Sequence, residues 1–458
     1  MIFNRSVRVT ALAWLLCATW SGSARAQEAG SASPPTFVQP QVSDPLLAPP
    51  PSAPGEVRSW GDAIALIQRS PDFLTGVDEI ERTLAQHRIV LAAVLPTLSA
   101  VGGYVHNFNV AEVTLAGVTL VSPPPTIWSA GATLSWNIID PRAIYGVGTD
   151  DLNIDIAKLS LADRRRVIAA SVVSAMLTTL AAKRVAELDR VGLRAALERL
   201  ELTQTRVKFA RGTELDIDRA RQDVEAARAL VISGDEALRR AYEALGQSVG
   251  SPTPLAAPAD LDIEGFETAV ASTCHLSNNI EQRPDVAAAR TRVELANREI
   301  TASELRFAPI VNVGSQAVAA SAATLGPTDS WEVAATITLP LYDGGLRYGA
   351  IRDARAATDQ ALQALAALRI EALIESARAA RAVSVDTAAR DVAKEQRDLA
   401  ARVDDRTRQG YASGLGTSLD LVTSAQALRQ ADINLALLDY QVAQARADAV
   451  LVNAECVY

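Results

Sequence analysis

The chain has few of the residues on which enzyme chemistry depends. Its 458 residues include only three histidines and three cysteines. The histidines, His87, His106 and His275, are not spaced as metal ligands, and no His-Glu-x-x-His motif occurs. P-loop, Gly-x-Ser-x-Gly and dinucleotide-binding glycine patterns are also absent from the sequence. The sequence therefore predicts no catalytic residue, no metal site and no cofactor, and it favours a protein that is not an enzyme.

Basic residues are also in the minority. The chain has 44 lysines and arginines against 53 acids, which gives a formal net charge of −9. Residues 1–26 contain three arginines and no acid, so their removal would take the charge to −12. A chain this acidic is a poor candidate for binding nucleic acid.

Residues 1–26 have the pattern of a secretory signal peptide. Two arginines precede an apolar stretch at 9–20, and Ala24-Arg25-Ala26 matches the small-residue cleavage pattern. The stretch is too short to span a membrane, and Cys17 lacks the flanking residues of a lipid acceptor. Cleavage after Ala26 leaves Cys274 and Cys456 in an oxidising compartment, where they either form a disulfide or remain two unrelated thiols.

Residues 27–58 contain eight prolines and few apolar side chains. Such a segment forms no helix and cannot bury a core, so we expect an extended, partly disordered chain. It either lies along the body of the protein or hangs free.

The remainder of the chain contains an internal repeat. Trp128 and Trp331 are 203 positions apart, as are Asp140 and Asp343, and a Gly-Thr-x-Leu-Asp motif occurs at 212–216 and again at 416–420. A repeat of about 205 residues is far longer than a solenoid unit. We therefore expect two similar structural repeats, at 59–250 and 283–458, joined by a connector at 251–282.

Each repeat is expected to contain two strands, at about 97–108 and 127–139 in the first and at about 309–320 and 331–341 in the second. From Trp128 to Ile138 the even positions are apolar and the odd positions small or polar, which indicates a strand with one apolar and one wetted face. Trp128, Trp136, Trp331 and Tyr104 belong to the apolar faces. Ten-residue strands of this kind suit a transmembrane barrel whose aromatics lie at the membrane interface; a soluble sandwich is the alternative.

The other segments predict very long helices. Residues 142–211 contain no proline and three glycines, Gly146, Gly148 and Gly192, and residues 346–409 contain no proline and one glycine, Gly349. After each Gly-Thr-x-Leu-Asp motif, apolar or small residues recur at alternating spacings of three and four, which is typical of a coiled coil. Glycines near 212 and at 410–417 allow sharp reversals. Four strands cannot close a barrel, so we expect three copies to share one of twelve strands, with their helices side by side.

Several segments together resemble the TolC family of outer-membrane efflux proteins. They are Arg283-Pro284-Asp285-Val286, Phe307-Ala308-Pro309, Leu339 to Gly345, and the turn from Gly410 to Leu421. The resemblance implies an α+β membrane protein: a homotrimer whose twelve-stranded transmembrane β-barrel, with four strands per chain, lies in outer-membrane lipid. A periplasmic α-helical coiled-coil tunnel continues the barrel, and 251–282 becomes an equatorial connector. The implied partners are a periplasmic adaptor protein and an inner-membrane pump.

The resemblance also implies a gate at the periplasmic tip. Tyr411 matches the tip tyrosine, Asp216 is its expected acceptor, and Asp420 matches an aspartate ring. Gly212 and Gly416 shape the turns, and Gly416 stands where an arginine holds the lock in other members, so a weaker or different lock is expected. The alternative for Asp216 and Asp420 is that they are acids at helix N-termini, favoured by the helix dipole.

Three functions are consistent with these features. The first is a passive exit duct for small molecules, namely drugs, toxic compounds or metal ions, in a tripartite efflux pump. The second is the outer-membrane component of a type I protein secretion system. The third is a non-transporting helical scaffold of the envelope, which accounts for the coiled coils but not for the two-faced strands.

Overall fold

The computed structural model describes residues 42–458 except 116, 123, 259–261, 278 and 322–327. The expected signal peptide and residues 27–41 lie outside the described residues. The helices are α1 (Trp60–Ile67), α2 (Pro71–Ala92), α3 (Pro141–Lys208), α4 (Glu214–Ser248), α5 (Ile263–Thr273), α6 (Pro284–Glu304), α7 (Leu346–Ser413) and α8 (Ser418–Leu451), with short 3₁₀ turns η1 (Pro45–Leu47), η2 (Ile280–Gln282) and η3 (Leu305–Phe307). The strands are β1 (Gly55–Glu56), β2 (Thr97–His106), β3 (Ala111–Leu115), β4 (Val118–Ser122), β5 (Thr126–Ile139), β6 (Leu255–Ala256), β7 (Cys274–Leu276), β8 (Ile310–Ala320), β9 (Asp329–Thr338) and β10 (Ala454–Cys456).

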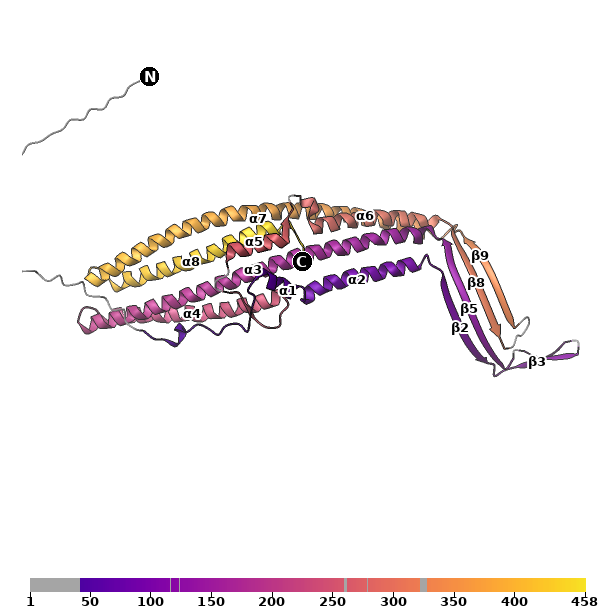
Figure 1. The fold of residues 1–458 in the computed structure, drawn as a ribbon, viewed down its shortest axis with the longest axis horizontal. Coiled ribbons are helices and arrows are strands. Elements are labelled where there is room, and N and C mark those ends of the chain that lie inside the picture. Colours follow the sequence, from indigo (N-terminus) through magenta and orange to yellow (C-terminus); the bar gives the residue numbers. More distant parts are fainter. Residues whose placement is uncertain (1–41, 116, 123, 259–261, 278, 322–327) are drawn as a thin grey trace, which may run out of the picture. The chain divides into compact units, whose positions relative to one another are not determined.

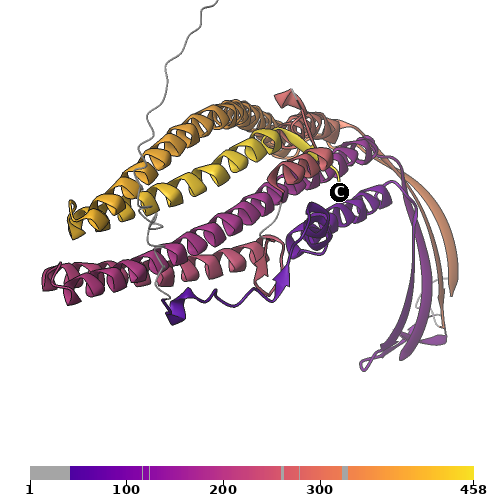
Figure 2. The ribbon, with the colours of Figure 1, turned by 60° about the vertical axis from the view of Figure 1, so that its left-hand side comes forward.

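The duplication of the sequence is visible in the lengths of the helices. Helices α3 and α7 are both 68 residues long, α4 and α8 have 35 and 34 residues, and α2 and α6 have 22 and 21. Proline occupies the first turn of α2, α3 and α6, where its missing N–H has no partner to lose. In both views α3 lies beside α4 and α7 beside α8, so each repeat contributes one long antiparallel pair (Figures 1 and 2).

The four long strands form one antiparallel sheet in the order β2-β5-β8-β9. The two repeats meet where β5 pairs with β8, and β2 and β9 are the outer strands. Figure 2 shows the four strands curving together at the end of the long helices that is opposite the α3–α4 and α7–α8 turns. The sequence expected these strands within a few residues of their bounds, but it missed the additional β3–β4 hairpin, whose turn contains Gly117 at a φ of +84°.

The register gives this sheet two chemically distinct faces. One face is apolar and carries all four of the singled-out aromatics, including Tyr104 directly opposite Trp128 and Trp331 opposite Ala317. The other face is richer in hydroxyl and amide side chains, although Val101, Val105 and Val318 also lie on it. Here Asn312 donates hydrogen bonds to Ser135 (3.1 Å) and Asn137 (2.8 Å). The apolar face is exposed in the single chain: the exposed fractions of Trp128 and Trp331 are 62% and 76%.

The main hydrophobic core surrounds the middle of α3. It is built by one cluster of buried side chains from α1, α2, α3, the end of α4, α5 and the C-terminus: Trp60, Phe73, Ile168, Val172, Met176, Leu245, Phe266 and Leu451. Among the described helices only α3 is long and apolar enough to cross a membrane by length and composition. One side of its apolar stretch, from Ile168 to Leu180, is buried in this core.

The C-terminus closes this core through the connector. Strand β10 pairs antiparallel with β7, which places Cys456 opposite Cys274, and a disulfide joins the two cysteines. The C-terminal end of α4 also meets the N-terminal end of α2. Gly250 has a φ of +73°, and a Cβ on it would lie 2.8 Å from the Cβ of Ser70, so this contact requires glycine.

The described part of the proline-rich segment lies along the body of the protein. Asp44 forms an ion pair with Arg228 of α4 (2.7 Å), and Leu46 and Leu47 pack against an apolar cluster shared by α3 and α4. Val57 is fully buried. The backbone of β1 pairs in parallel with β6 of the connector. The sequence left two arrangements open for this segment. In the structure, residues 42–58 lie along the body of the protein.

Candidate gate at the helical turns

The turn between α3 and α4 ends in a capping box. Thr213 is the N-cap of α4, and the carboxylate of Asp216 accepts hydrogen bonds from the Thr213 backbone N–H and hydroxyl, both at 2.9 Å. The N–H of Asp216 donates in return to the threonine hydroxyl (3.3 Å). Gly212 precedes the cap, and a Cβ there would lie 3.0 Å from Val207, so a larger side chain would crowd the turn. The turn is thus fixed locally by Thr213 and Asp216.

The turn between α7 and α8 repeats this chemistry. Thr417 and Asp420 form the second capping box, with 2.6 Å between the threonine hydroxyl and the carboxylate. Gly414 is the C-cap of α7, and its φ of +84° is the left-handed conformation that glycine adopts readily. A Cβ on Gly416 would lie 3.2 Å from the backbone nitrogen of Tyr411, so a side chain at 416 would require the turn to move. An arginine at this position, as the resemblance implies for other members of the family, would therefore need the backbone at Tyr411 to shift by a few tenths of an ångström.

Two contacts join the two turns within one chain. The hydroxyl of Ser418, at the start of α8, donates a hydrogen bond to Asp216. Arg206, near the end of α3, donates a hydrogen bond to the backbone carbonyl of Tyr411, and its guanidinium lies 4.0 Å from the centre of the Tyr411 ring. Tyr411 is buried. Tyr411 and Asp216 therefore both take part in joining the turns, but each has a different partner from the one expected.

The two aspartates have lowered pKa values. The hydrogen bond from Ser418 lowers the pKa of Asp216 most, and the Thr213 backbone and hydroxyl add to the effect against the opposing effect of burial. Hydrogen bonds from Thr417 lower the pKa of Asp420. Both are acids in the first turn of a helix, as the alternative in the sequence predicted. Asp420 is exposed, whereas Asp216 also binds across to the other helical pair.

Buried ionic contacts continue the connection away from the turns. Asp223 of α4 is 2% exposed, pairs with Arg199 of α3 at 2.5 Å and accepts a hydrogen bond from Gln426 of α8 at 3.0 Å. On α7, Asp404 is likewise buried and accepts a hydrogen bond from Ser424 of α8 at 3.1 Å. A carboxylate removed from water needs such partners, so the helices are held in a fixed register.

Only one of these contacts has a signal in the sequence. Ser418 occupies the variable position of the Gly-Thr-x-Leu-Asp motif, where the first repeat has Glu214, and this difference was the available signal. Arg206 and Arg199 are two of many arginines on long helices, and no spacing distinguishes them. Their roles depend on which faces of α3, α4, α7 and α8 meet, which is tertiary information.

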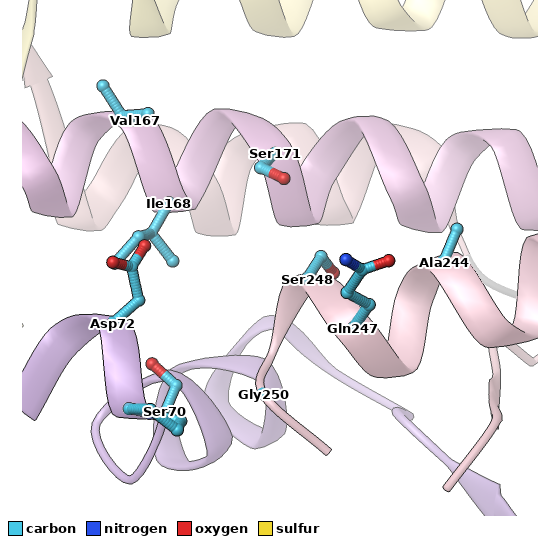
Figure 3. Close-up of a pocket in the computed structure, with 10 residues that line it drawn as sticks. Ser70, Asp72, Val167, Ile168, Ser171, Ala244, Gln247, Ser248 and Gly250 are labelled. Carbon is cyan, nitrogen blue, oxygen red and sulfur yellow. The ribbon is translucent and has the colours of Figure 1, made fainter. Parts of the chain in front are cut away.

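Elsewhere the described residues offer little for catalysis. They contain no group of three histidine, cysteine or acidic side chains able to hold a metal ion. A hollow of about 510 Å³ lies where α2 begins and α4 ends against α3 (Figure 3). Asp72 is the one titratable side chain among the residues that line this hollow. The hollow therefore contains no pair of side chains that could act as general acid and general base.

Comparisons with known proteins agree with this geometry. The sequence model of the family described as outer membrane efflux protein matches residues 65–251 and 276–449. The outer membrane protein OprJ of Pseudomonas aeruginosa is 34% identical over 92 residues, which cover 19% of this chain and 19% of OprJ. The alkaline protease secretion protein AprF of the same species is 24% identical over 407 residues, covering 83% of this chain and 81% of AprF. The crystal structure of the Campylobacter jejuni CmeC outer membrane channel superposes with a TM-score of 0.72 at 15% identity, covering 90% of this chain and 94% of CmeC.

Proposed function

Because the chain belongs to the outer membrane efflux protein family, we propose that three copies of it form the passive exit duct of a tripartite pump that exports small molecules. The chain is an outer-membrane channel component with periplasmic helices, and it is not an enzyme. The proposal adds to this its trimeric state, its cargo and its partners: a periplasmic adaptor and an inner-membrane pump that supplies the energy. The cargo class is drugs, toxic compounds or metal ions.

The four-stranded sheet carries this proposal. Its outer strands, β2 and β9, each pair on one side only within the described residues. Inside a lipid bilayer every unpaired backbone group costs several kcal/mol, so the two edges must find partners in other copies. Two copies would supply eight strands, the number of the smallest barrels, whereas three supply twelve and leave a wider lumen. The apolar face then meets lipid and the hydroxyl and amide face lines the lumen.

The turns between the long helices form the gate of this duct. The Arg206–Tyr411 and Asp216–Ser418 contacts hold the α3–α4 turn against the α7–α8 turn in each copy. Opening the periplasmic end requires these turns to separate. Two contacts therefore hold the gate closed: Arg206 packs against the buried Tyr411, and Ser418 donates a hydrogen bond to Asp216. Asp420, exposed at the same end, adds negative charge there.

Protein secretion by a type I system is the second candidate. The alignment with AprF, a protein named for protease secretion, extends over 407 residues, whereas that with OprJ covers 92. Both systems use the same kind of duct, so the fold does not separate them.

Deletion of the gene in its host separates the cargo classes. A small-molecule duct predicts increased accumulation of a dye or drug panel with an unchanged set of secreted proteins. A secretion duct predicts the loss of one secreted protein with unchanged accumulation. Purified protein in a planar lipid bilayer tests the duct itself: insertion should give discrete conductance steps. Protein that needs no detergent for extraction and never inserts would instead support the scaffold.

A further inference from the structure

The lumenal face of the sheet is almost free of charge. Its side chains, which are the ones on the hydroxyl and amide face, alternate with those of the apolar face along each strand. Among the described residues of β2, β5, β8 and β9, this face carries one ionised side chain, Glu332 of β9. The other acid of β9, Asp329, pairs with Ala319 on the opposite face at the beginning of the strand.

The register places Glu332 in a continuous row across the sheet. Glu332 is opposite Gln316, Gln316 is opposite Thr133, and Thr133 is opposite Ser99. The row therefore contains one side chain from each strand, and three of the four are neutral. Glu332 is exposed and forms no ion pair with any described residue. Its charge is consequently neither neutralised by a partner nor buried in protein.

We propose that Glu332 is the residue that sets the ion preference of the barrel lumen. This inference rests on the trimeric duct proposed above, in which threefold symmetry places three copies of Glu332 at one level of the lumen. The low-dielectric wall of a barrel focuses the field of such charges into the water inside it. A ring of carboxylates in an otherwise neutral wall attracts inorganic cations and repels anions. The barrel thus has a selective level of its own, separate from the acids at the periplasmic gate.

Ionic strength provides a signature for this ring. The Debye length is about 10 Å at 0.1 M salt and about 3 Å at 1 M. At low salt the field of Glu332 therefore extends well into the lumen, and at high salt it is confined near the wall. Cation preference caused by Glu332 should be clear in dilute KCl and should fade in concentrated KCl.

The test is the reversal potential of single channels of the full-length protein in a planar bilayer under a KCl gradient. In a gradient near 0.1 M, Glu332→Gln should lower the potassium-to-chloride permeability ratio by at least about twofold, and near 1 M it should have little effect. Glu332→Lys should shift the preference toward chloride. Asp329→Asn is the matched control, since it removes a carboxylate from the same strand but from the other face, and it should leave the ratio unchanged.

The outcomes separate this inference from the proposed duct. If the wild-type protein forms no channels, the trimeric duct fails and the ring fails with it. If channels form but Glu332→Gln and Glu332→Lys leave the ratio at its wild-type value, the duct stands and the inference about Glu332 is overturned. An equal change in Asp329→Asn would also overturn it, because the effect would then not depend on the lumenal face. Asp420→Asn, measured in parallel, reports the contribution of the gate.

Discussion

Replacing Arg206 with alanine should open the gate. The substitution removes the guanidinium from the Tyr411 ring and the hydrogen bond to the Tyr411 carbonyl. A half-buried cation–π contact and a charge-assisted hydrogen bond together contribute about 2 kcal/mol after discounting for solvent. Three copies lose about 6 kcal/mol, and at about 1.4 kcal/mol per factor of ten this shifts the closed-to-open ratio by roughly four orders of magnitude.

The assay is the conductance of purified trimers in a planar bilayer. Arg206→Ala should convert small steps into large ones, and Arg206→Lys, which keeps the charge but loses the planar guanidinium, should give an intermediate result. Arg221→Ala is the control because its ion pair with Asp218 is exposed, at 62% and 70% for the two side chains, and contributes little. Wild-type steps from Arg206→Ala, with normal insertion and an intact trimer on a native gel, would remove Arg206 from the gate.

Three further outcomes test the rest of the architecture. Because the disulfide between Cys274 and Cys456 closes a sequence separation of 182 residues, replacing both with alanine should lower the free energy of unfolding in urea by up to about 5 kcal/mol; two titratable thiols in the unreduced, denatured protein would show that the bond does not form. The pKa of Asp216 is lowered in the folded protein, so the stabilisation by its charge is fully present above the unfolded pKa and is lost as pH falls through the folded pKa. Acid should therefore open the pore only below the ordinary aspartate range. Ser418→Ala should move the midpoint of opening to higher pH, and an unchanged midpoint would contradict the role of Ser418. Asp223→Asn leaves a buried arginine unpaired and should destabilise the trimer by about 3–5 kcal/mol in thermal or denaturant unfolding; a loss below about 1 kcal/mol would be inconsistent with a buried pair.

The sequence was informative wherever one rule acts along a whole segment. The strands could be predicted because each side chain from Trp128 to Ile138 follows the same two-residue alternation, set by two different surroundings of the sheet. The long helices could be predicted because proline is absent from their interiors, and the turns because Thr213 and Thr417 cap helices in the same motif. These features are local, and they were repeated in the second half.

The sequence was uninformative wherever a residue takes its partner from a distant element. Tyr411 was expected to bind Asp216, whereas the contacts within one chain place Tyr411 against Arg206 of α3 and Asp216 against Ser418 of α8. The β3–β4 hairpin was missed because it lies inside a connection that the repeat does not require. The fate of residues 42–58 depended on Leu46 and Leu47 fitting an apolar cluster between α3 and α4, which is not evident before that cluster is assembled.

The proposed gate shows how the repeat of one motif and a single difference between its copies together produce a directional contact. Both turns inherited the same capping box, so Asp216 and Asp420 are held alike by Thr213 and Thr417. A hydroxyl at position 418 can donate to a carboxylate, but the equivalent Glu214, once ionised, can only accept. Asp216 therefore has a partner across the pair of turns, whereas the exposed Asp420 accepts hydrogen bonds from Thr417 of its own turn. One difference between the two copies of the motif thus separates a carboxylate that joins the two turns from one that stays within its own turn.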